Sequence, residues 1–567
     1  MADDLCGVPT MHQRHFPRRW FLLACLASST LAPSILQAGP PADRPKLVVW
    51  IIVDQLRGDM PWRYLPESAA GGLRQLRRRG TWCRNAHFEH ATTFTAVGHA
   101  TLLTGAYVPQ HGIAGNEWRD PVTGRDGGAV EDDRCTLLAP GARRGCSPHR
   151  LTSTTLSDEL VLASAGRSRV FTVSGKDRAA VLTAGRLGKA FWFDPDSGRF
   201  VTSSFYENRE PAWAARFNDA APAEKYREAS WDLRDDRAGY LHADRDDRAC
   251  EKGYRHLGAT FPHRPGAGKP EDFLKALTYT PFADELAAAF ARQLVEAENL
   301  GGGDAVDMLI LSLSATDHIG HAWGPESLEA EDNVRRLDDL LAGFLTFLDG
   351  RLGLARCLIV LTADHGMDDV PECAATAGFH AGRLDPAEFL AAINRAVRER
   401  FRIDRDVAVA FWSPSVYFDQ QAVAAAGLDG AAVERIAVEA LMRMPGVALA
   451  AARSDLLAGR VPLSPLAEPL RRSFHPTRSG NVLIVPEPHW YLYHETHAYA
   501  AMHGTPWAYD TFVPVIVAGP GIPVGVIDRT VSPASLAPTL ASLLGIKPPS
   551  GCVAPVIPEL LGGAPDP

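Results

Sequence analysis

Four short apolar runs constrain the fold more strongly than any other feature of this sequence. They are rich in β-branched residues and bounded by turn-forming residues, and they predict buried strands at residues 46–53, 306–313, 357–362 and 511–518. Such uniformly apolar strands are typical of parallel sheets. Helical patterns lie between the runs, at residues 283–298, 328–349 and 532–544, the last with Ser532 as its expected cap. This alternation predicts an α/β fold built on a doubly wound, mostly parallel sheet.

Two stretches interrupt the alternation of strands and helices. Residues 195–280 are rich in Asp, Arg, Trp, Tyr and Pro, and residues 370–495 also depart from the pattern. We interpret both as insertions over the ligand-binding face of the sheet. The sequence therefore predicts one domain over residues 39–567 that carries these two inserted segments.

The first 38 residues are interpreted as an export signal. Arg14, Arg18 and Arg19 provide a basic start, residues 20–27 are apolar, and Ala38 is a small residue suited to cleavage. The arginine pair also resembles a twin-arginine signal, so the export route stays open. The expected location is the periplasm or the exterior of a bacterium. No later segment is long and apolar enough to suggest a membrane span.

Composition and cysteine content exclude several classes of protein. The chain has 58 Lys+Arg and 67 Asp+Glu residues and a net charge of −9, which disfavours nucleic acid or an anionic membrane as the main partner. Seven of the nine cysteines follow residue 38, and none forms a CxxC pair, so zinc-ribbon and thioredoxin folds are not expected. A Cys135–Cys146 bridge is favoured in an oxidising compartment, although sequence does not fix the connectivity.

Metal-ligating residue types follow three of the predicted strands. Asp54 follows the first run, Asp317 and His321 follow the second after a short turn, and Asp364 and His365 follow the third. One such residue alone would more often cap a helix or stabilise a turn. Three strand ends together predict a metal site, because the carboxyl ends of parallel strands meet at one edge. Mixed Asp and His ligands suit zinc or another transition metal.

A hydroxyl-rich segment at residues 92–116 adds a candidate nucleophile. Thr95 precedes a Gly-His pair that we expect to form a turn, a short helix follows, and a second turn ends at Asn116. A hydroxyl at a helix N-terminus next to a metal can ionise to an attacking alkoxide. Ordinary helix capping by Thr95 is the alternative.

Taken together, these motifs resemble the alkaline phosphatase superfamily. The resemblance is to its threonine-nucleophile branch of secreted bacterial phosphomonoesterases, the phosphate-irrepressible alkaline phosphatase type, and it covers most of the chain after the signal. The segments that carry it are VDQLRGD with Asp54, TAVGHATLLTG with Thr95, HGIAGN with Asn116, SGKDRAAVLTAG with Lys176 and Arg178, AFWFD at 190–194, TDHIGHAWGP, TADHGM and HGTPWAYDTFVPVIVAGPGI.

The resemblance implies a complete site for hydrolysis of small-molecule phosphate monoesters. It implies two zinc ions, one held by Asp317, His321 and His503, the other by Asp54, Asp364, His365 and the Thr95 oxygen. Thr95 would form a phosphothreonine, and the phosphoryl group would be bound by Asn116, Lys176 and Arg178. The last two are two positions apart, so on an extended segment they would face the same way. Lys176 would replace a third metal, so no structural magnesium is expected.

Other activities are compatible with parts of this pattern. Phosphodiesterases and nucleotide pyrophosphatases of the same superfamily share the metal ligands, but a diester has one fewer charged oxygen for the Lys/Arg pair. Cys146 begins a C-x-P-x-R string found in sulfatases, but no Leu-Thr-Gly turn follows it as one follows Thr95. A secreted binding protein with a decayed active site would also share the fold, but it should have lost a metal ligand, and all the expected metal ligands are present in this sequence. The sequence thus predicts a zinc-dependent alkaline phosphatase of broad substrate range. It does not predict the oligomeric state or the physiological ester.

Overall fold

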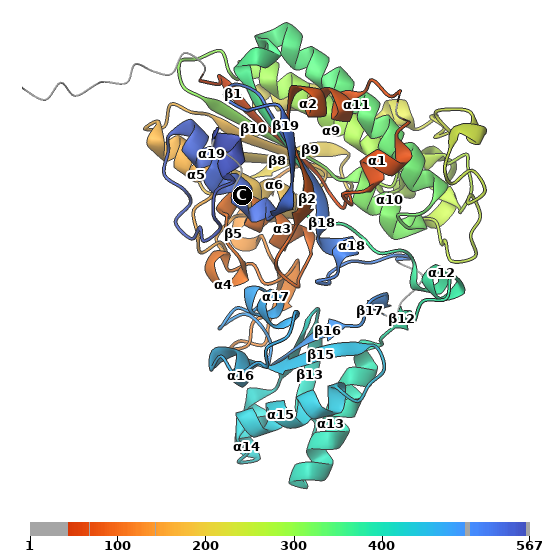
Figure 1. Ribbon diagram of the computed structural model, residues 1–567, viewed down its shortest axis with the longest axis vertical. Helices are drawn as coiled ribbons and strands as arrows, with labels where there is room; N and C mark the ends of the chain where they lie inside the picture. The colour runs from red at the N-terminus through yellow and green to blue at the C-terminus, as the bar shows by residue number, and fades with distance from the viewer. Residues whose placement is uncertain (1–43, 67, 142, 494–498, 563–567) are drawn as a thin grey trace, which may run out of the picture. The chain divides into compact units, whose positions relative to one another are not determined.

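The structure is a computed structural model that describes residues 44–66, 68–141, 143–493 and 499–562 (Figure 1). The expected export signal at residues 1–38 lies outside these ranges. Among the described residues, no helix combines the length and apolar character needed to cross a membrane.

One large mixed sheet organises the described chain. Its strand order is β19-β2-β18-β11-β1-β10-β7-β8-β9-β5-β6, in which the edge strand β19 spans Gly525–Val531. The five central strands are parallel: β11 (Cys357–Thr362), β1 (Leu47–Val53), β10 (Asp307–Leu313), β7 (Val170–Ser174) and β8 (Lys189–Asp194). Residues of β1, β10 and β11 are buried throughout, as expected for strands covered on both faces. The predicted α/β fold is confirmed, and three of the four predicted strands form its parallel centre.

The fourth predicted strand does not run parallel to its neighbours. β18 (Phe512–Ala518) pairs antiparallel with both β11 and β2 (Gly80–His87). Antiparallel pairs also join the other flank, where β8, β9 (Arg199–Ser203), β5 (Glu131–Leu138) and β6 (Arg144–Cys146) follow one another. The expectation of a parallel strand at 511–518 was wrong because an apolar run reports burial on both faces and carries no information about direction.

Helices pack on both faces of the sheet (Figure 1). Helix α9 (Phe282–Ala297) contacts β10 and β7, and α11 (Leu328–Leu352) packs on α9 and on α2 (Gly72–Arg79). Helix α6 (Asp177–Ala184) contacts β7 and β8 and packs against α3 (Thr95–Thr104) and α5 (Leu156–Ala163), and α19 (Leu536–Leu544) packs against α3. The helix predicted at 532–544 begins with a 3-10 turn, and Ser532 makes no side-chain cap hydrogen bond.

A second, four-stranded antiparallel sheet lies within residues 370–495. Its strand order is β13 (Ala408–Trp412), β14 (Ser415–Phe418), β16 (Val482–Pro486) and β15 (Val447–Ala452). Helices α13 (Pro386–Phe401) and α15 (Gly430–Leu441) share a separate apolar core with it. Residues 195–280 contain β9 of the main sheet, followed by α7 (Ala212–Asp219), α8 (Phe273–Leu277) and five 3-10 turns.

The disulfide favoured from the sequence is absent from the described structure. Cys135 and Cys146 are buried and unbridged, and the bond joins Cys250 to Cys373, which are 123 positions apart. The prediction relied on the short loop between Cys135 and Cys146. Long-range packing of the two inserted stretches decided the pairing instead.

Candidate active site

The candidate site lies at the carboxyl ends of the central parallel strands. Val53 is in register with Leu313, and Ile52 with Thr362, so β1, β10 and β11 end together. The Asp54 amide continues this pairing by donating to the Leu313 carbonyl at 2.9 Å. Parallel pairing therefore brings together residues that are hundreds of positions apart in the chain.

The first group of candidate ligands consists of Asp317, His321 and His503. The first two lie one turn apart on α10 (Ala315–Trp323), and the third comes from the loop before α18 (Ala508–Thr511). Asp317 Oδ1 is 3.3 Å from His321 Nε2 and 3.5 Å from His503 Nε2. All three side chains are buried, and their ligand atoms are close enough together to hold a metal ion.

The second group consists of Asp54, Asp364 and His365. His365 Nε2 lies 3.5 Å from Asp54 Oδ1 and 3.6 Å from Asp364 Oδ2. These three atoms are buried and have no hydrogen-bond partner among the described residues. Buried polar atoms left unpaired are costly, and three of them converging on one point fit a bound cation. The second group can therefore also hold a metal ion.

All three histidines are oriented in the same way. Their Nδ1 atoms donate to backbone carbonyls: His321 to Ala501 at 2.7 Å, His503 to Thr93 at 2.7 Å and His365 to Gly366 at 2.9 Å. Because a carbonyl only accepts, these bonds place the proton on Nδ1 and leave the Nε2 lone pair directed at the carboxylates. A backbone bond that fixes tautomer and ring orientation is the usual support of a histidine metal ligand.

Lys176 lies between the two groups. Its ammonium donates to Asp54 Oδ2 at 2.6 Å and to Asp317 Oδ2 at 2.5 Å. Burial raises the pKa of Asp54, and the neighbouring Asp364 raises it further. Burial alone would also raise the pKa of Asp317, but Lys176 and His321 hold it well below its ordinary value. The crowded carboxylates therefore need positive charge beyond that of one lysine.

The expectation that Lys176 and Arg178 lie together on an extended segment was wrong. Lys176 is the N-cap residue of α6 and Arg178 lies in its first turn. Arg178 Nε is buried and has no hydrogen-bond partner among the described residues. The two cations therefore lie on the loop and first helical turn that follow β7, at the same edge of the sheet as the carboxylates.

Thr95 is the first residue of α3 and is buried. The Asn116 side chain is fixed beside it, since Asn116 Oδ1 accepts from the Ala96 amide at 2.9 Å. The expected Gly-His turn is instead part of α3. Gly98 lets this helix approach the backbone of Asp364 closely, because a Cβ at position 98 would lie 2.2 Å from the Asp364 carbonyl oxygen. The start of α3 thus packs directly against the second group.

Several residues that support the site were not identified from the sequence. Gln55 connects the two groups, because its backbone N–H donates to Asp364 Oδ1 at 3.1 Å and its side-chain Nε2 donates to Asp317 Oδ1 at 2.8 Å. His99, by contrast, was expected from its place in the Thr95 motif to support the site or pack near it, and its Nδ1 lies 3.1 Å from Asp364 Oδ2. Asp510 Oδ2 accepts from the Gly504 and Thr505 amides and so fixes the loop after His503. Only adjacency to a predicted ligand could have indicated Gln55 beforehand.

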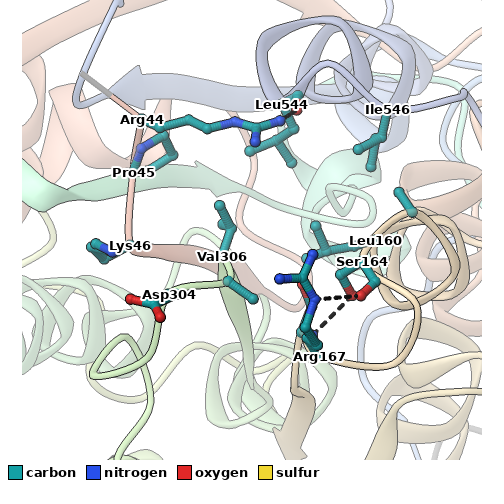
Figure 2. A pocket seen from close by; sticks show the side chains of 13 residues that line it. Arg44, Pro45, Lys46, Leu160, Ser164, Arg167, Asp304, Val306, Leu544 and Ile546 are labelled. Carbon is teal, nitrogen blue, oxygen red and sulfur yellow. Dashed lines mark hydrogen bonds between the residues drawn. The ribbon is translucent and has the colours of Figure 1, made fainter. Parts of the chain in front are cut away.

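Two other features lie apart from these groups. A pocket of about 170 Å³ lies at the amino end of the sheet, beside the residues that precede β1 and β10 (Figure 2). Two of its arginines already donate hydrogen bonds to backbone carbonyls, Arg44 to Leu544 and Arg167 to Ser164. Cys146, of the sulfatase-like string, lies on β6 with its thiol 3.7 Å from Asp177 Oδ2. It belongs to neither group of candidate ligands.

Comparison with known proteins gives a consistent result. Residues 48–506 match the family model described as type I phosphodiesterase / nucleotide pyrophosphatase. The chain is 31% identical to alkaline phosphatase PhoV of Synechococcus elongatus over 91% of this chain and 93% of that protein. It is also 31% identical to alkaline phosphatase PafA of Elizabethkingia meningoseptica, over 96% of this chain and 99% of that protein. The crystal structure of wild-type PafA superposes with a TM-score of 0.85 at 30% identity and covers 93% of this chain and all of that one.

The fold and its paired aspartate and histidine groups define a member of the alkaline phosphatase superfamily. The matched range, residues 48–506, includes both candidate metal-binding groups. Within that superfamily the chain belongs to the type I phosphodiesterase / nucleotide pyrophosphatase family. The resemblance inferred from the sequence motifs is thereby confirmed.

Proposed function

We propose that this chain is a zinc-dependent alkaline phosphatase that hydrolyses a broad range of small phosphate monoesters through a phosphothreonine at Thr95. The observation that carries the proposal is the bridging position of Lys176 between two buried Asp/His groups. The similarity to PhoV and PafA, both named alkaline phosphatases, supports it. A signal peptide at 1–38 and a periplasmic or secreted location belong to the same proposal.

The two groups provide the ligands for one zinc ion each. Bound zinc would lower the pKa of the Thr95 hydroxyl and stabilise negative charge on the oxygens of the displacement, with Asp317, His321 and His503 holding one ion and Asp54, Asp364 and His365 the other. The Thr95 side chain is positioned at the N-terminus of α3, where the helix dipole favours a negatively charged oxygen. It would attack phosphorus, and water would then hydrolyse the phosphothreonine.

Three further side chains would bind the phosphoryl group. Lys176 and Arg178 bring two positive charges to the start of α6, and Asn116 is held against the first turn of α3. A monoester dianion presents three non-bridging oxygens and two charges, so it gains more from this set than a diester monoanion does. This charge balance favours monoesterase activity over the phosphodiesterase or nucleotide pyrophosphatase alternative.

The decisive experiment compares an aryl phosphate monoester with the matching diester. We expect kcat/KM of the purified mature protein to favour the monoester strongly, to be abolished by a chelator and to be restored by zinc. A preference for the diester would be compatible with the fold and with both candidate metal-binding groups. It would contradict the proposed roles of Lys176, Arg178 and Asn116 in binding the phosphoryl group of a monoester.

A further inference from the structure

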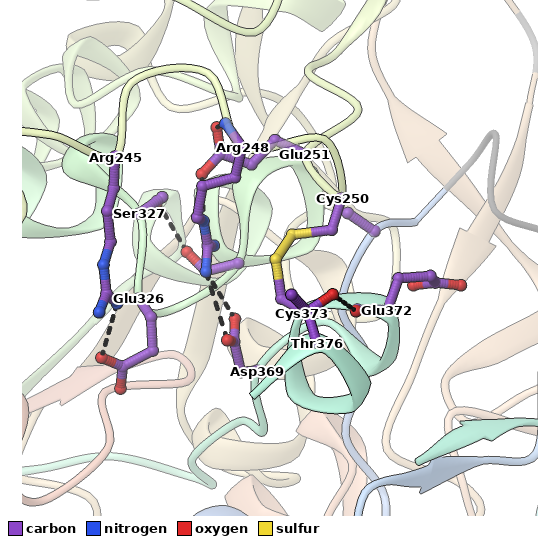
Figure 3. The surroundings of a disulfide bond; sticks show 12 residues. Arg245, Arg248, Cys250, Glu251, Glu326, Ser327, Asp369, Glu372, Cys373 and Thr376 are labelled. Carbon is purple, nitrogen blue, oxygen red and sulfur yellow. Dashed lines mark hydrogen bonds and ion pairs between the residues drawn. A yellow bond between two sulfur atoms is a disulfide. The ribbon is translucent and has the colours of Figure 1, made fainter. Parts of the chain in front are cut away.

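The Cys250–Cys373 disulfide joins two segments that lie 123 positions apart in the sequence (Figure 3). Its sulfur atoms belong to a small apolar cluster with Met367, Val370, Ala500 and Ala501. Met367 lies two residues after His365, and Ala501 accepts the Nδ1 hydrogen bond of His321. The disulfide is therefore packed against segments that lead directly to candidate metal ligands.

The Cys250 side of the bond is attached to the helix that carries His321. The Lys252 and Gly253 amides both donate to the Ala322 carbonyl, at 3.3 and 3.1 Å. Arg248, two residues before Cys250, donates from Nη2 to the Trp323 carbonyl at 2.9 Å. This segment thus holds the last turn of α10, immediately after His321.

The Cys373 side leads to the same histidine by another route. Cys373 lies on α12 (Pro371–Thr376), next to Glu372, which forms a two-point ion pair with Arg383 at 2.8 and 2.9 Å. Arg383 Nη2 donates to the Ala500 carbonyl, and the Ala500 amide donates to the His321 carbonyl at 2.7 Å. Ala501 then accepts from His321 Nδ1 at 2.7 Å.

We propose that the disulfide is a positioning element for His321. The route from Cys250 ends at Ala322 and Trp323, directly after His321, and the route from Cys373 ends at His321 itself, so the bond closes a ring of contacts around this histidine. Inside the ring, the backbone of α10 and the carbonyl that orients the imidazole are fixed relative to each other. The inference rests on the proposed function, because it requires His321 to bind a metal ion.

Opening the ring would affect one metal-binding group more than the other. Without the bond, the Ala500–Ala501 segment and the end of α10 can move apart, and the His321 ring loses its fixed orientation. His365 is oriented by the carbonyl of its neighbour Gly366, and Asp54 by its place at the end of β1, so among the described residues the second group contacts the disulfide only through the packing of Met367. The Arg248–Asp369 ion pair at 3.2 Å also joins the segment before Cys250 to the segment before Cys373 (Figure 3). This contact would remain without the disulfide, so it limits the expected loss of zinc affinity.

The test is a zinc titration of the full mature chain against a chromophoric chelator. We expect wild type to bind two Zn²⁺ ions tightly, and Cys250→Ala/Cys373→Ala to bind one of them about tenfold more weakly, the lower end of the range for losing the support of a metal ligand. The matched control is Cys83→Ala/Cys357→Ala, which removes two buried thiols away from the site and should leave both affinities unchanged. Equal affinities in wild type and the disulfide variant would overturn the inference.

A second measurement does not depend on the folding of that variant. A trialkylphosphine reduces the folded wild-type protein: the phosphine takes up the oxygen of one water molecule, and the S–S bond becomes two thiols. We expect the same tenfold loss at one site and a lower kcat that excess zinc restores. A kcat that falls and is not restored by zinc would indicate a purely structural bond and contradict the inference. Absence of zinc binding by wild type would instead refute the proposed function itself.

Discussion

The Lys176 ammonium lies 2.6 Å from Asp54 Oδ2, and the same nitrogen also contacts Asp317. One cation therefore neutralises a carboxylate from each candidate metal-binding group. Under the proposed function, two bound dications would take over that neutralisation and leave the ammonium available to an anionic substrate. The position of Lys176 would then link metal binding to phosphoryl recognition.

Joint replacement of this lysine and its neighbour should distinguish monoesters from diesters. We expect Lys176→Ala/Arg178→Ala to lower kcat/KM for an aryl monoester by roughly 100- to 1,000-fold, the usual loss on removing charge-stabilising donors. The diester should lose much less, because it carries one fewer negative charge. Steady-state kinetics on both substrates measure the difference. Lys189→Ala, which removes a partly exposed partner of Glu207, is the control and should change neither rate; equal losses on both substrates would refute the monoester-specific role.

The nucleophile prediction concerns the side chain at the start of α3. Thr95→Ala should lower kcat by more than about 1,000-fold, since loss of a covalent nucleophile leaves only the catalysis provided by the rest of the site. Thr95→Ser keeps the hydroxyl at the same helix terminus and should retain activity. Rapid acid quench with radiolabelled substrate should trap phosphate on wild type and on the serine variant only. A Thr95→Ala enzyme with near wild-type kcat would exclude the residue as nucleophile.

Metal removal should change stability as well as activity. Ions that bind only the folded chain stabilise it, by about 2.7 kcal/mol at a free concentration one hundred times Kd. A chelator should therefore lower the free energy of unfolding measured in urea, and zinc should restore it. His503→Ala should show a smaller chelator effect, because one group loses a ligand. An effect of the same size in wild type and variant would argue against metal binding at His503.

Glu326 should make part of the stability depend on pH. Burial by itself would raise its pKa, but hydrogen bonds from His242, Arg63 and Arg57 hold the pKa of this carboxyl far below its ordinary value of 4.5. A carboxyl with a lowered folded pKa stabilises the fold above its ordinary pKa, and this contribution is lost as the pH falls toward the folded value. We expect Glu326→Gln to lower the unfolding free energy of the metal-free protein by about 2 kcal/mol at pH 7.

The difference between wild type and Glu326→Gln should stay constant above about pH 5 and shrink progressively below it. Urea unfolding at a series of pH values measures this. Glu224→Gln removes the more exposed partner of Arg227 and serves as the control, with little effect at any pH. A difference that does not depend on pH would show that Glu326 acts through packing and not through its charge.

Much of the site could be predicted because the information is local. Asp54, Asp317 and Asp364 each follow an apolar run, and the parallel arrangement of those runs requires that their ends meet. The histidines at 321 and 365 lie within four residues of these aspartates. His503 has no such local marker, and only the family resemblance suggested its place beside Asp317.

Other features could not be obtained from patterns along the chain. The bridging contacts of Gln55 and Lys176 depend on side-chain positions within a packed site. The Cys250–Cys373 pairing depends on how two long inserted segments fold against α10 and α12. Short spacing favoured Cys135 and Cys146 instead, because closing a short loop costs less entropy, but packing outweighed that preference.

By itself the sequence determined the α/β class, the buried central strands and the aspartate and histidine side chains at their ends that are candidate metal ligands. Hydrophobic periodicity and the spacing of residues within one turn are local properties, so they can be read directly from the chain. Only the tertiary structure decided the antiparallel direction of β18, the contacts of Lys176 with Asp54 and Asp317, and the Cys250–Cys373 pairing. These depend on contacts between segments more than a hundred residues apart, where burial and hydrogen bonding among many competing partners select a single arrangement.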